Sequence, residues 1–309
     1  MRRILLTGIT GQVGQELQRT LAALGNVIGV DSKTMDLAAS TMIRQVISEV
    51  KPDVIVNGAA YTAVDKAESE VELAKSVNVI APMILAEEAQ RLGAGLIHIS
   101  TDYVFDGRKN TPYTETDTPN PINVYGESKL VGEEKIRQTC ENYIILRTAW
   151  VYSTYGKGNF VKTMLKLGAE RDQIRVVADQ VGTPTWARDI AEAIAQLLPL
   201  LSPGATEKSA LTGTYHFTNS GVTSWYDFAI AIFEEAEQLG YKLKVQRVVP
   251  ITTSEYPTPA LRPAYSVLSC QKISAVLGTY PPHWRQRLRQ MLLELYNYTF
   301  YESNYSQRR

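Results

Sequence analysis

Two side chains suited to proton transfer, Tyr125 and Lys129, stand four residues apart in the chain. On a helix this spacing places both side chains on one face, with the ammonium close to the phenol. A neighbouring cation stabilises phenolate and lowers a phenol pKa that starts near ~10. The pair therefore predicts a proton donor that works near neutral pH. Taken alone, the spacing is equally typical of two surface side chains on a helix.

A third group, Thr101, follows an apolar run that predicts a strand over residues 96–99. Open α/β sheets bind their ligands at the carboxyl ends of the strands. A hydroxyl at that end, from Ser100 or Thr101, can hydrogen-bond a substrate carbonyl oxygen and hold it where the Tyr125 proton arrives. We therefore expect Thr101, Tyr125 and Lys129 to form a catalytic triad.

A glycine-rich turn near the N-terminus suits a dinucleotide. Gly8, Gly11 and Gly14 follow an apolar run at residues 4–7 and open a helical pattern. Glycines permit a tight turn and a close approach of backbone to pyrophosphate, while the helix N-terminus supplies N–H groups and partial positive charge. The spacing is G-x-x-G-x-x-G, so a bare glycine turn between strand and helix stays the alternative.

The end of the second predicted strand bears on which dinucleotide binds. Asp31 follows the apolar run at residues 27–30, where its carboxylate can accept hydrogen bonds from ribose hydroxyls and favour NADH. Lys33 can instead meet the 2′-phosphate of NADPH, so both cofactors stay open. Asp31 can also simply begin a turn. Other positions that can lie beside the cofactor are Asp36, Leu37 and residues 57–62.

Strand-like and helical patterns alternate along the first half of the chain, which indicates parallel βαβ units. Continuously apolar runs, such as residues 54–56, are typical of strands that helices cover on both faces. The predicted fold class is therefore α/β, a Rossmann-like doubly wound parallel sheet with a smaller C-terminal α/β lobe that binds substrate. The predicted strands are residues 4–7, 27–30, 54–57, 96–100 and 143–148.

Prolines divide the chain into shorter elements after about residue 150. We expect a dinucleotide-binding domain over residues 1–150, to which some later segments return, and a mainly substrate-binding lobe over residues 151–309. The polar stretch at 201–212 predicts a surface loop. The last few residues of the tail at 296–309 are expected to fray.

Composition and charge exclude several classes of partner. The 309 residues are 44% hydrophobic and 21% charged, as in ordinary globular domains. Lysine plus arginine and aspartate plus glutamate number 32 each, so no net field draws the protein to nucleic acid or a membrane surface. No apolar segment approaches the ~20 residues of a membrane span. We therefore expect a small-molecule substrate and a cytoplasmic location.

The cysteines and histidines of the sequence suggest no metal site. Cys140 and Cys270 lack metal-type spacing and suit a reducing cytoplasm. His98, His216 and His283 show no ligand spacing either. His98 stands inside an apolar strand, where we expect a buried histidine satisfied by its neighbours, and no histidine is assigned a role.

Taken in order, these motifs resemble those of the extended short-chain dehydrogenases. Further stretches are similar to the dTDP-4-dehydrorhamnose reductase family within that group, and the resemblance covers nearly the whole chain. The stretches that carry it are NGAA at residues 57–60, TAVDKAE at 62–68, STDYVF at 100–105, YGESK at 125–129, RTAWVY at 147–152, DQVGTPT at 179–185 and YPTPALRP at 256–263.

The resemblance implies the last step of dTDP-L-rhamnose synthesis, in which NADPH or NADH reduces the C4 ketone of dTDP-4-dehydro-β-L-rhamnose. Tyr125 would protonate the C4 oxygen, Lys129 would also hold the nicotinamide ribose, and Trp150 would pack an indole face on the sugar. The residues implied to hold the cofactor are Gly8, Gly11, Gln12, Val13, Gly14, Asp31, Asp36, Leu37, Ala60, Tyr61, Thr62, Tyr125 and Lys129. Those implied to bind the nucleotide sugar are Thr101, Asp102, Trp150, Asn159, Phe160 and Arg262.

For two features of the family, this chain offers an alternative interpretation. The guanidinium fork of Arg262 suits a diphosphate, although a surface ion pair is the simpler interpretation. Some family members are homodimers bridged by Mg²⁺ through acidic residues. Here Glu16 and Glu294 fit such positions, but Arg188 stands where a third acid is expected. We therefore assign no metal ligand, while Mg²⁺ and a homodimer stay open.

Two other functions remain as alternatives. A nucleotide-sugar epimerase shares the fold and the Tyr–Lys pair but keeps its nicotinamide bound through the cycle. A dehydratase is disfavoured because Tyr103, and not a glutamate, follows Asp102. A non-catalytic, NADP-binding regulatory subunit does not need a proton donor, whereas this chain retains Tyr125 and Lys129.

Overall fold

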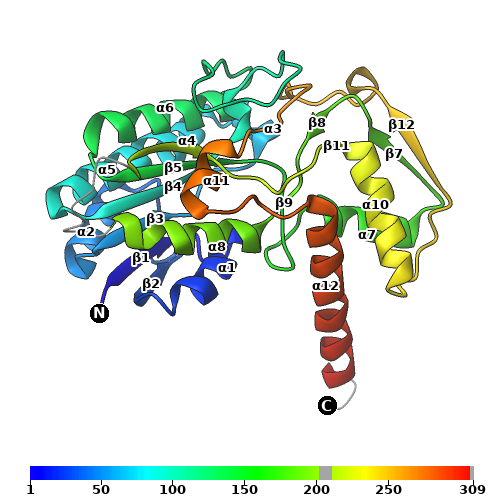
Figure 1. Cartoon of the computed structure of the whole chain (residues 1–309), viewed down its shortest axis with the longest axis horizontal. Coiled ribbons are helices and arrows are strands. Elements are labelled where there is room, and N and C mark those ends of the chain that lie inside the picture. The colour runs from blue at the N-terminus through cyan, green and yellow to red at the C-terminus, as the bar shows by residue number, and fades with distance from the viewer. Residues whose placement is uncertain (202–210, 307–309) are drawn as a thin grey trace.

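A six-stranded parallel sheet forms the centre of the larger lobe (Figure 1). The computed structural model describes residues 1–201 and 211–306, with side chains described as far as residue 298. The strands lie in the order β10-β5-β4-β3-β1-β2. They are β1 (Arg3–Thr7), β2 (Asn26–Val30), β3 (Val54–Asn57), β4 (Gly95–Thr101), β5 (Tyr143–Thr148) and β10 (Gly213–His216).

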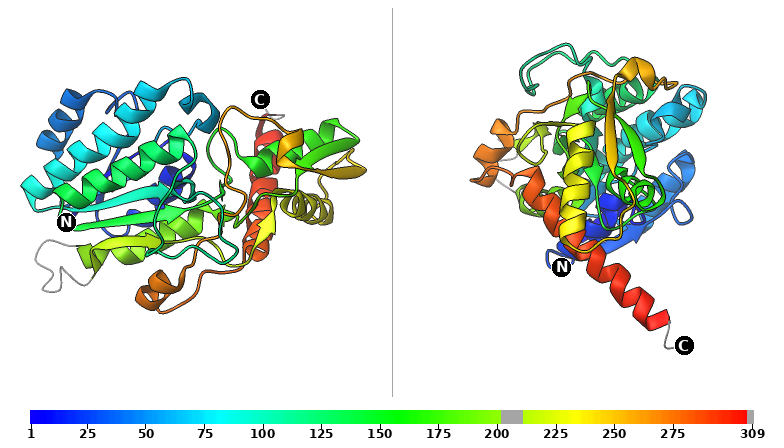
Figure 2. Two further views of the ribbon diagram at one scale, coloured as in Figure 1. Left: turned by 90° about the horizontal axis from the view of Figure 1, so that it is seen from above. Right: turned by 90° about the vertical axis from the view of Figure 1, so that its right-hand side faces the viewer.

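Helices cover both faces of this sheet, which explains why its strands are apolar throughout (Figure 2). Ile4 and Leu6 of β1 pack into the core on one face, whereas Leu5 packs into the core on the other. Neither face therefore needs polar side chains. One layer contains α1 (Gln12–Leu21), α8 (Ala187–Leu197) and α11 (Gln271–Leu277), and the other α2 (Ser40–Val50), α5 (Ala81–Leu92) and α6 (Val124–Thr139).

The strand order determines where a ligand crevice opens. The chain goes from β1 to β2 on one side of it and then to β3 on the other. In doubly wound sheets such a reversal leaves a crevice at the carboxyl ends of the strands. Gly8 follows β1 and Gly58 follows β3. The glycine turn therefore lies at this crevice.

The smaller lobe, on the right of Figure 1, has a hydrophobic core of its own. Its two-stranded parallel sheet pairs β7 with β12, and Phe228, Ile232 and Leu288 are fully buried against it and its helices. The elements are α7 (Phe160–Glu170), β7 (Gln173–Val177), α10 (Trp225–Gln238), β12 (Arg247–Ile251) and α12 (Trp284–Ser306).

Several short elements complete the described part of the chain. The strands among them are β6 (Val151–Tyr152), which pairs with β9 (Thr185–Trp186), and β8 (Val181–Gly182), which pairs with β11 (Thr223–Ser224). The helices are α3 (Val64–Ala67), α4 (Val71–Lys75), η1 (Ser76–Ile80), η2 (Asp102–Val104), η3 (Leu198–Leu201) and η4 (Thr253–Glu255).

The predicted fold class is confirmed, including the smaller lobe. Among the described residues after 150, several elements return to the large sheet: β10 pairs with β5, and α8, η3 and α11 pack on one face. Of the predicted loop at 201–212, residues 202–210 lie outside the described residues, as do residues 307–309 of the tail. Within the described ranges no helix combines the length and the apolar character needed to cross a membrane.

Candidate active site

A cavity of about 790 Å³ opens at the carboxyl ends of β1, β3, β4 and β5. Most of the predicted site residues meet there. Those that line the cavity are Gly8, Gly11, Gln12, Val13, Asp31, Asp36, Leu37, Ala60, Thr62, Thr101, Asp102, Tyr125, Lys129 and Trp150. The predicted residues outside its lining are Gly14, Tyr61, Asn159, Phe160 and Arg262.

The glycine turn has the shape that a dinucleotide needs. Gly8 adopts a left-handed backbone with φ of 73°, which glycine tolerates without strain. Gly11 caps α1 without any side chain bonded to the first N–H groups of the helix, so these donors stay available to an anion. At Gly14 an added Cβ would overlap the Gly8 carbonyl oxygen. Gly14 therefore packs the helix on the turn, while Gly8 and Gly11 face the cavity.

Asp31 both begins a turn and lines the cavity. Its Oδ1 accepts hydrogen bonds from the backbone N–H groups of Lys33 and Thr34, at 3.0 Å each. The Thr34 hydroxyl, followed by these backbone donors, holds the pKa of Asp31 below its usual value. Asp31 is thus an ionised acceptor in the lining of the cavity. Lys33 does not belong to the cavity lining.

Tyr125 and Lys129 lie on the buried face of α6. The helix approaches η2 closely because residue 126 is a glycine, where a Cβ would overlap the Tyr103 carbonyl oxygen. Lys129 is 1% exposed, and its Nζ donates to the Ile99 carbonyl at 2.7 Å and lies 3.0 Å from His98 Nε2.

Burial, rather than the neighbouring cation, dominates the protonation of this pair. It raises the pKa of Tyr125 to about 12 and lowers the pKa of Lys129 to about 8. The expectation that Lys129 lowers the phenol pKa is therefore wrong for this structure, because the lysine nitrogen is bonded to strand β4. A phenol with this pKa keeps its proton at neutral pH, as a proton donor must.

Two buried polar atoms at the cavity have no hydrogen-bond partner among the described residues: Asp102 Oδ2 and Thr148 Oγ1. Thr148 ends β5 directly opposite Thr101 of β4. Thr101 Oγ1 donates to Asp102 Oδ1 at 3.1 Å, and burial raises the pKa of Asp102 to about 6. Unsatisfied buried groups are rare, so both atoms are suited to ligand hydroxyls. Sequence reasoning missed Thr148, although its place at a strand end beside Thr101 was the available signal.

Trp150 is held between two parts of the smaller lobe. Its backbone is left-handed, with φ of 47°, and its indole stacks on Trp225 with ring centroids 3.5 Å apart and planes 6° apart. A Cβ added to Gly182 would lie 2.5 Å from Cε2 and 2.8 Å from Cζ2 and Nε1. These nearly equal distances put Gly182 on the opposite face of the indole. The protein thus covers both faces of the indole, one of which the resemblance assigns to the sugar.

Asn159 and Phe160 support the site from α7 without lining the cavity. Asn159 caps α7 by accepting from Lys162 N at 3.0 Å. Its amide also donates to Gln12 Oε1 at 2.9 Å, which ties the smaller lobe to α1. Phe160 packs against Trp225, with ring centroids 4.5 Å apart. In this structure the two residues hold Gln12 and the Trp225–Trp150 stack in place.

Comparison with known proteins identifies the family. The RmlD substrate binding domain family matches residues 1–297. The dTDP-4-dehydrorhamnose reductase of Burkholderia thailandensis is 46% identical over 285 residues, which cover 92% of this chain and 95% of that protein. This chain belongs to the dTDP-4-dehydrorhamnose reductase family.

Two further relatives agree with this assignment. The Escherichia coli K12 dTDP-4-dehydrorhamnose reductase is 44% identical over 301 residues, covering 96% of this chain and 99% of that protein. The crystal structure of the Bacillus anthracis Ames dTDP-4-dehydrorhamnose reductase in complex with NADP matches with a TM-score of 0.86 and 39% identity, covering 95% of this chain and 99% of that chain.

Arg262, which the family resemblance assigns to the diphosphate, is engaged within the protein. Its guanidinium forms a two-pronged ion pair with Asp65 at 2.8 Å for each bond, and it donates to Thr258 Oγ1 at 2.7 Å. This pair joins the loop of the smaller lobe to α3. Tyr61 is similarly occupied, since its hydroxyl donates to Glu70 at 2.7 Å. Both keep their predicted roles only as proposals.

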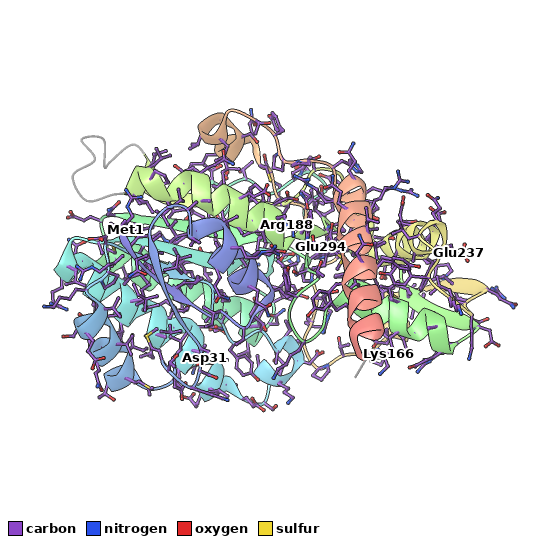
Figure 3. All side chains as sticks on the ribbon, turned by 90° about the horizontal axis from the view of Figure 1, so that it is seen from below. Met1, Asp31, Lys166, Arg188, Glu237 and Glu294 are labelled. Atoms are coloured by element: carbon purple, nitrogen blue, oxygen red, sulfur yellow. The ribbon has the colours of Figure 1, made fainter. Side chains whose placement is uncertain are left out.

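The residues at the family's metal position do not fit Mg²⁺. Figure 3 shows Arg188 beside Glu294, where α8 meets α12. The Arg188 guanidinium lies 2.6 Å from Glu294 Oε2 and 3.4 Å from Glu16 Oε2. A cation bonded to both carboxylates takes the place that a metal ion would need. In residues 1–201 and 211–306, no group of three or more His, Cys, Asp or Glu side chains is placed to hold a metal.

Proposed function

We propose that this chain reduces the C4 keto group of dTDP-4-dehydro-β-L-rhamnose to give dTDP-L-rhamnose, with NADPH or NADH as reductant, in the last step of dTDP-rhamnose biosynthesis. The observation that carries the proposal is the convergence of Thr101, Tyr125 and Lys129 on one cavity with the glycine turn. Family membership supports the choice of substrate.

The cavity has room for a dinucleotide along the carboxyl ends of β1 and β3. The N-terminus of α1 offers free N–H groups to the pyrophosphate, and the ionised Asp31 offers an acceptor to a ribose hydroxyl. When bound, the reduced nicotinamide supplies the hydride that attacks C4. The solved structure of a relative in complex with NADP supports NADPH as the cofactor. Asp31 keeps NADH as the alternative, because its carboxylate can accept hydrogen bonds from the ribose hydroxyls.

The protein's part in the reaction is to hold the ketone and supply one proton. Tyr125 retains its proton, with a pKa raised to about 12 by burial, until the C4 oxygen gains charge and accepts it. The Thr101 side chain opposes this rise in pKa, which supports its proposed role of orienting the same oxygen. Thr148 and Asp102 offer their free oxygens to sugar hydroxyls. Because the site is buried, few waters compete for these bonds.

The test is the loss of absorbance of the reduced nicotinamide, with enzymatically made dTDP-4-dehydrorhamnose and NADPH or NADH in separate reactions. Substrate-dependent oxidation establishes the reductase and ranks the cofactors. Tyr125→Phe should abolish most turnover and leave dinucleotide binding intact, whereas Tyr113→Phe, outside the cavity lining, serves as the control. Dinucleotide binding without oxidation by the unaltered enzyme would favour the epimerase or the regulatory subunit.

We also propose that the enzyme works in the cytoplasm, with a nucleotide sugar as its partner. Support comes from Cys140 and Cys270, both free thiols, as expected in a reducing compartment. A homodimer stays a prediction, and sedimentation at micromolar concentration tests it.

A further inference from the structure

A buried chain of hydrogen bonds leads from Lys129 to the glycine turn. His98 Nε2 lies 3.0 Å from Lys129 Nζ, and its Nδ1 lies 2.9 Å from the Asn57 amide nitrogen. Asn57 Oδ1 accepts from Thr7 Oγ1 at 2.7 Å, and Thr7 Oγ1 accepts from the backbone N–H of Ala59 at 3.1 Å. The chain thus crosses the neighbouring strands β4, β3 and β1, and it ends at residues that line the cavity.

These polar groups are among the most buried in the molecule: Thr7, Asn57, His98 and Lys129 are each at most 1% exposed. Apolar side chains would fill the same positions in a parallel sheet without the cost of desolvating polar groups. A fully connected network at this depth specifies one arrangement of its members. The arrangement that it specifies here includes the proposed catalytic lysine.

The direction of the hydrogen bonds depends on the charge of Lys129. An ammonium has no lone pair, so His98 Nε2 must accept from it, and Nδ1 must then carry the hydrogen and donate to the Asn57 oxygen. A neutral amine can instead accept from Nε2–H, in which case Nδ1 accepts from the Asn57 NH₂ group. The orientation of the Asn57 amide, with its oxygen bonded to Thr7 and its nitrogen facing His98, matches the second direction. A half turn of the Asn57 amide interconverts the two.

We propose that His98 is a positioning residue for Lys129: by exchanging its tautomer as the Asn57 amide turns, it keeps the lysine nitrogen bonded and in place in both charge states. The catalytic importance of Lys129 rests on the proposed function, but the coupling itself does not. Burial and the charge of Lys129 hold the pKa of His98 well below its usual value. His98 therefore changes tautomer and not charge.

Other titratable groups near Lys129 do not offer this exchange. Glu133, one turn further along α6, attracts the ammonium, but its carboxylate is bonded to Arg147 at 2.7 and 2.9 Å. Tyr125 precedes Lys129 on the same face of α6, and Asp102 lies on η2. On β3 and β1 the hydrogen-bonded chain contains only Asn57 and Thr7, and neither side chain titrates. Within the hydrogen-bonded chain from Lys129 to Thr7, His98 is thus the one residue that can move a proton between two ring nitrogens.

The first test measures the pH dependence of kcat/KM in three variants. His98→Leu removes one of the two protein acceptors of the ammonium, so its alkaline limb should move down by about one pH unit or more. His98→Gln supplies an amide oxygen in place of Nε2 and should restore most of the wild-type profile. His216→Gln alters another buried histidine, bonded at Nδ1 to the Tyr113 carbonyl at 3.1 Å. It should lower stability and leave the profile unchanged.

The second test needs no substitution and no substrate. With ¹⁵N-histidine labelling, the three histidines of the chain give a simple spectrum in which protonated and unprotonated ring nitrogens resonate far apart. The His98 proton should move from Nδ1 to Nε2 as pH rises through about 8, where burial places the pKa of Lys129. In Lys129→Met this transition should disappear.

Two results would overturn the inference: an unmoved alkaline limb in folded His98→Leu, or a single His98 tautomer from about pH 6 to about pH 10 in the unaltered protein. Neither depends on the identity of the sugar. By contrast, failure of the unaltered enzyme to oxidise NADPH or NADH would refute the proposed function and leave the spectroscopic result standing.

Discussion

Substitution of Gly14 by alanine should damage the fold more than the cofactor site, whereas Gly11→Ala should do the reverse. At Gly14 the added Cβ would overlap the Gly8 oxygen and lie 2.7 Å from the Gly8 carbon and 3.0 Å from Ile9 Cα. All three are backbone atoms, which no rotamer change can move away. The Gly8 carbonyl also accepts from Gly11 N at 2.9 Å, and Gly8 N donates to Val30 at 3.0 Å.

The cost of Gly14→Ala follows from these contacts. Relief of the overlap requires the turn to shift and to weaken the Gly11–Gly8 hydrogen bond, at about 1 kcal/mol, in addition to an overpacking cost of about 1–3 kcal/mol. Alanine returns about 1 kcal/mol through its higher helix propensity. The net loss is about 1–3 kcal/mol, which lowers the Tm of a chain of this size by roughly 2–6 °C.

At Gly11 the added Cβ meets only the Gly8 oxygen, at 3.2 Å, and the backbone, with φ of −80° and ψ of 171°, suits alanine. Stability should therefore change by less than about 1 kcal/mol. The methyl group would lie where the pyrophosphate approaches, so the Kd for NADPH should rise at least about tenfold. Circular dichroism melting and a fluorescence titration measure the two effects. A wild-type Tm for Gly14→Ala, or a wild-type Kd for Gly11→Ala, would refute this reasoning.

Three further predictions concern polar side chains. Thr148→Val should leave stability unchanged, because the Thr148 hydroxyl has no hydrogen-bond partner among the described residues. The same change should raise the KM for the sugar about tenfold. An unchanged KM would contradict the proposed contact between Thr148 and the substrate. Burial alone would raise the pKa of Glu133, but hydrogen bonds and charge from Arg147 hold this pKa below its usual value. Its contribution to stability is therefore present at neutral pH and lost as pH falls through the folded-state pKa. Glu133→Gln should cost about 3–5 kcal/mol at pH 7 by urea denaturation, and less below about pH 4. For Arg188→Glu, which assembles three carboxylates, Mg²⁺ should raise the Tm, whereas the unaltered protein should melt alike with Mg²⁺ or EDTA.

Local sequence patterns predicted the fold and the residues that meet at the centre of the cavity. Continuous apolar runs predicted the buried parallel strands because both faces of such strands meet helices. The glycines at 8, 11 and 14 predicted the turn because its backbone leaves no room for side chains. Tyr125 and Lys129 were recognisable because one helical turn determines their relation. Each of these features depends on residues close together in the chain.

The features that the sequence left undetermined depend on contacts between distant segments. The order of the strands places His98, Asn57 and Thr7 next to one another, so that they form a hydrogen-bonded chain to Lys129. The apolar run around His98 predicts only that this residue is buried, and it does not predict which residues of β3 and β1 lie beside it. Burial, which raises the Tyr125 pKa and lowers that of Lys129, is equally a property of the assembled lobes.

The same distinction explains the remaining differences between prediction and structure. Trp225 and Gly182 enclose Trp150, and Asp65 occupies the guanidinium of Arg262, through pairings that cross the two lobes. The sequence by itself determined which groups are available for chemistry and which elements carry them. Only the tertiary structure decided which of these groups are buried and which are bonded to other parts of the protein. Burial and these bonds arise only when segments distant in the sequence come into contact.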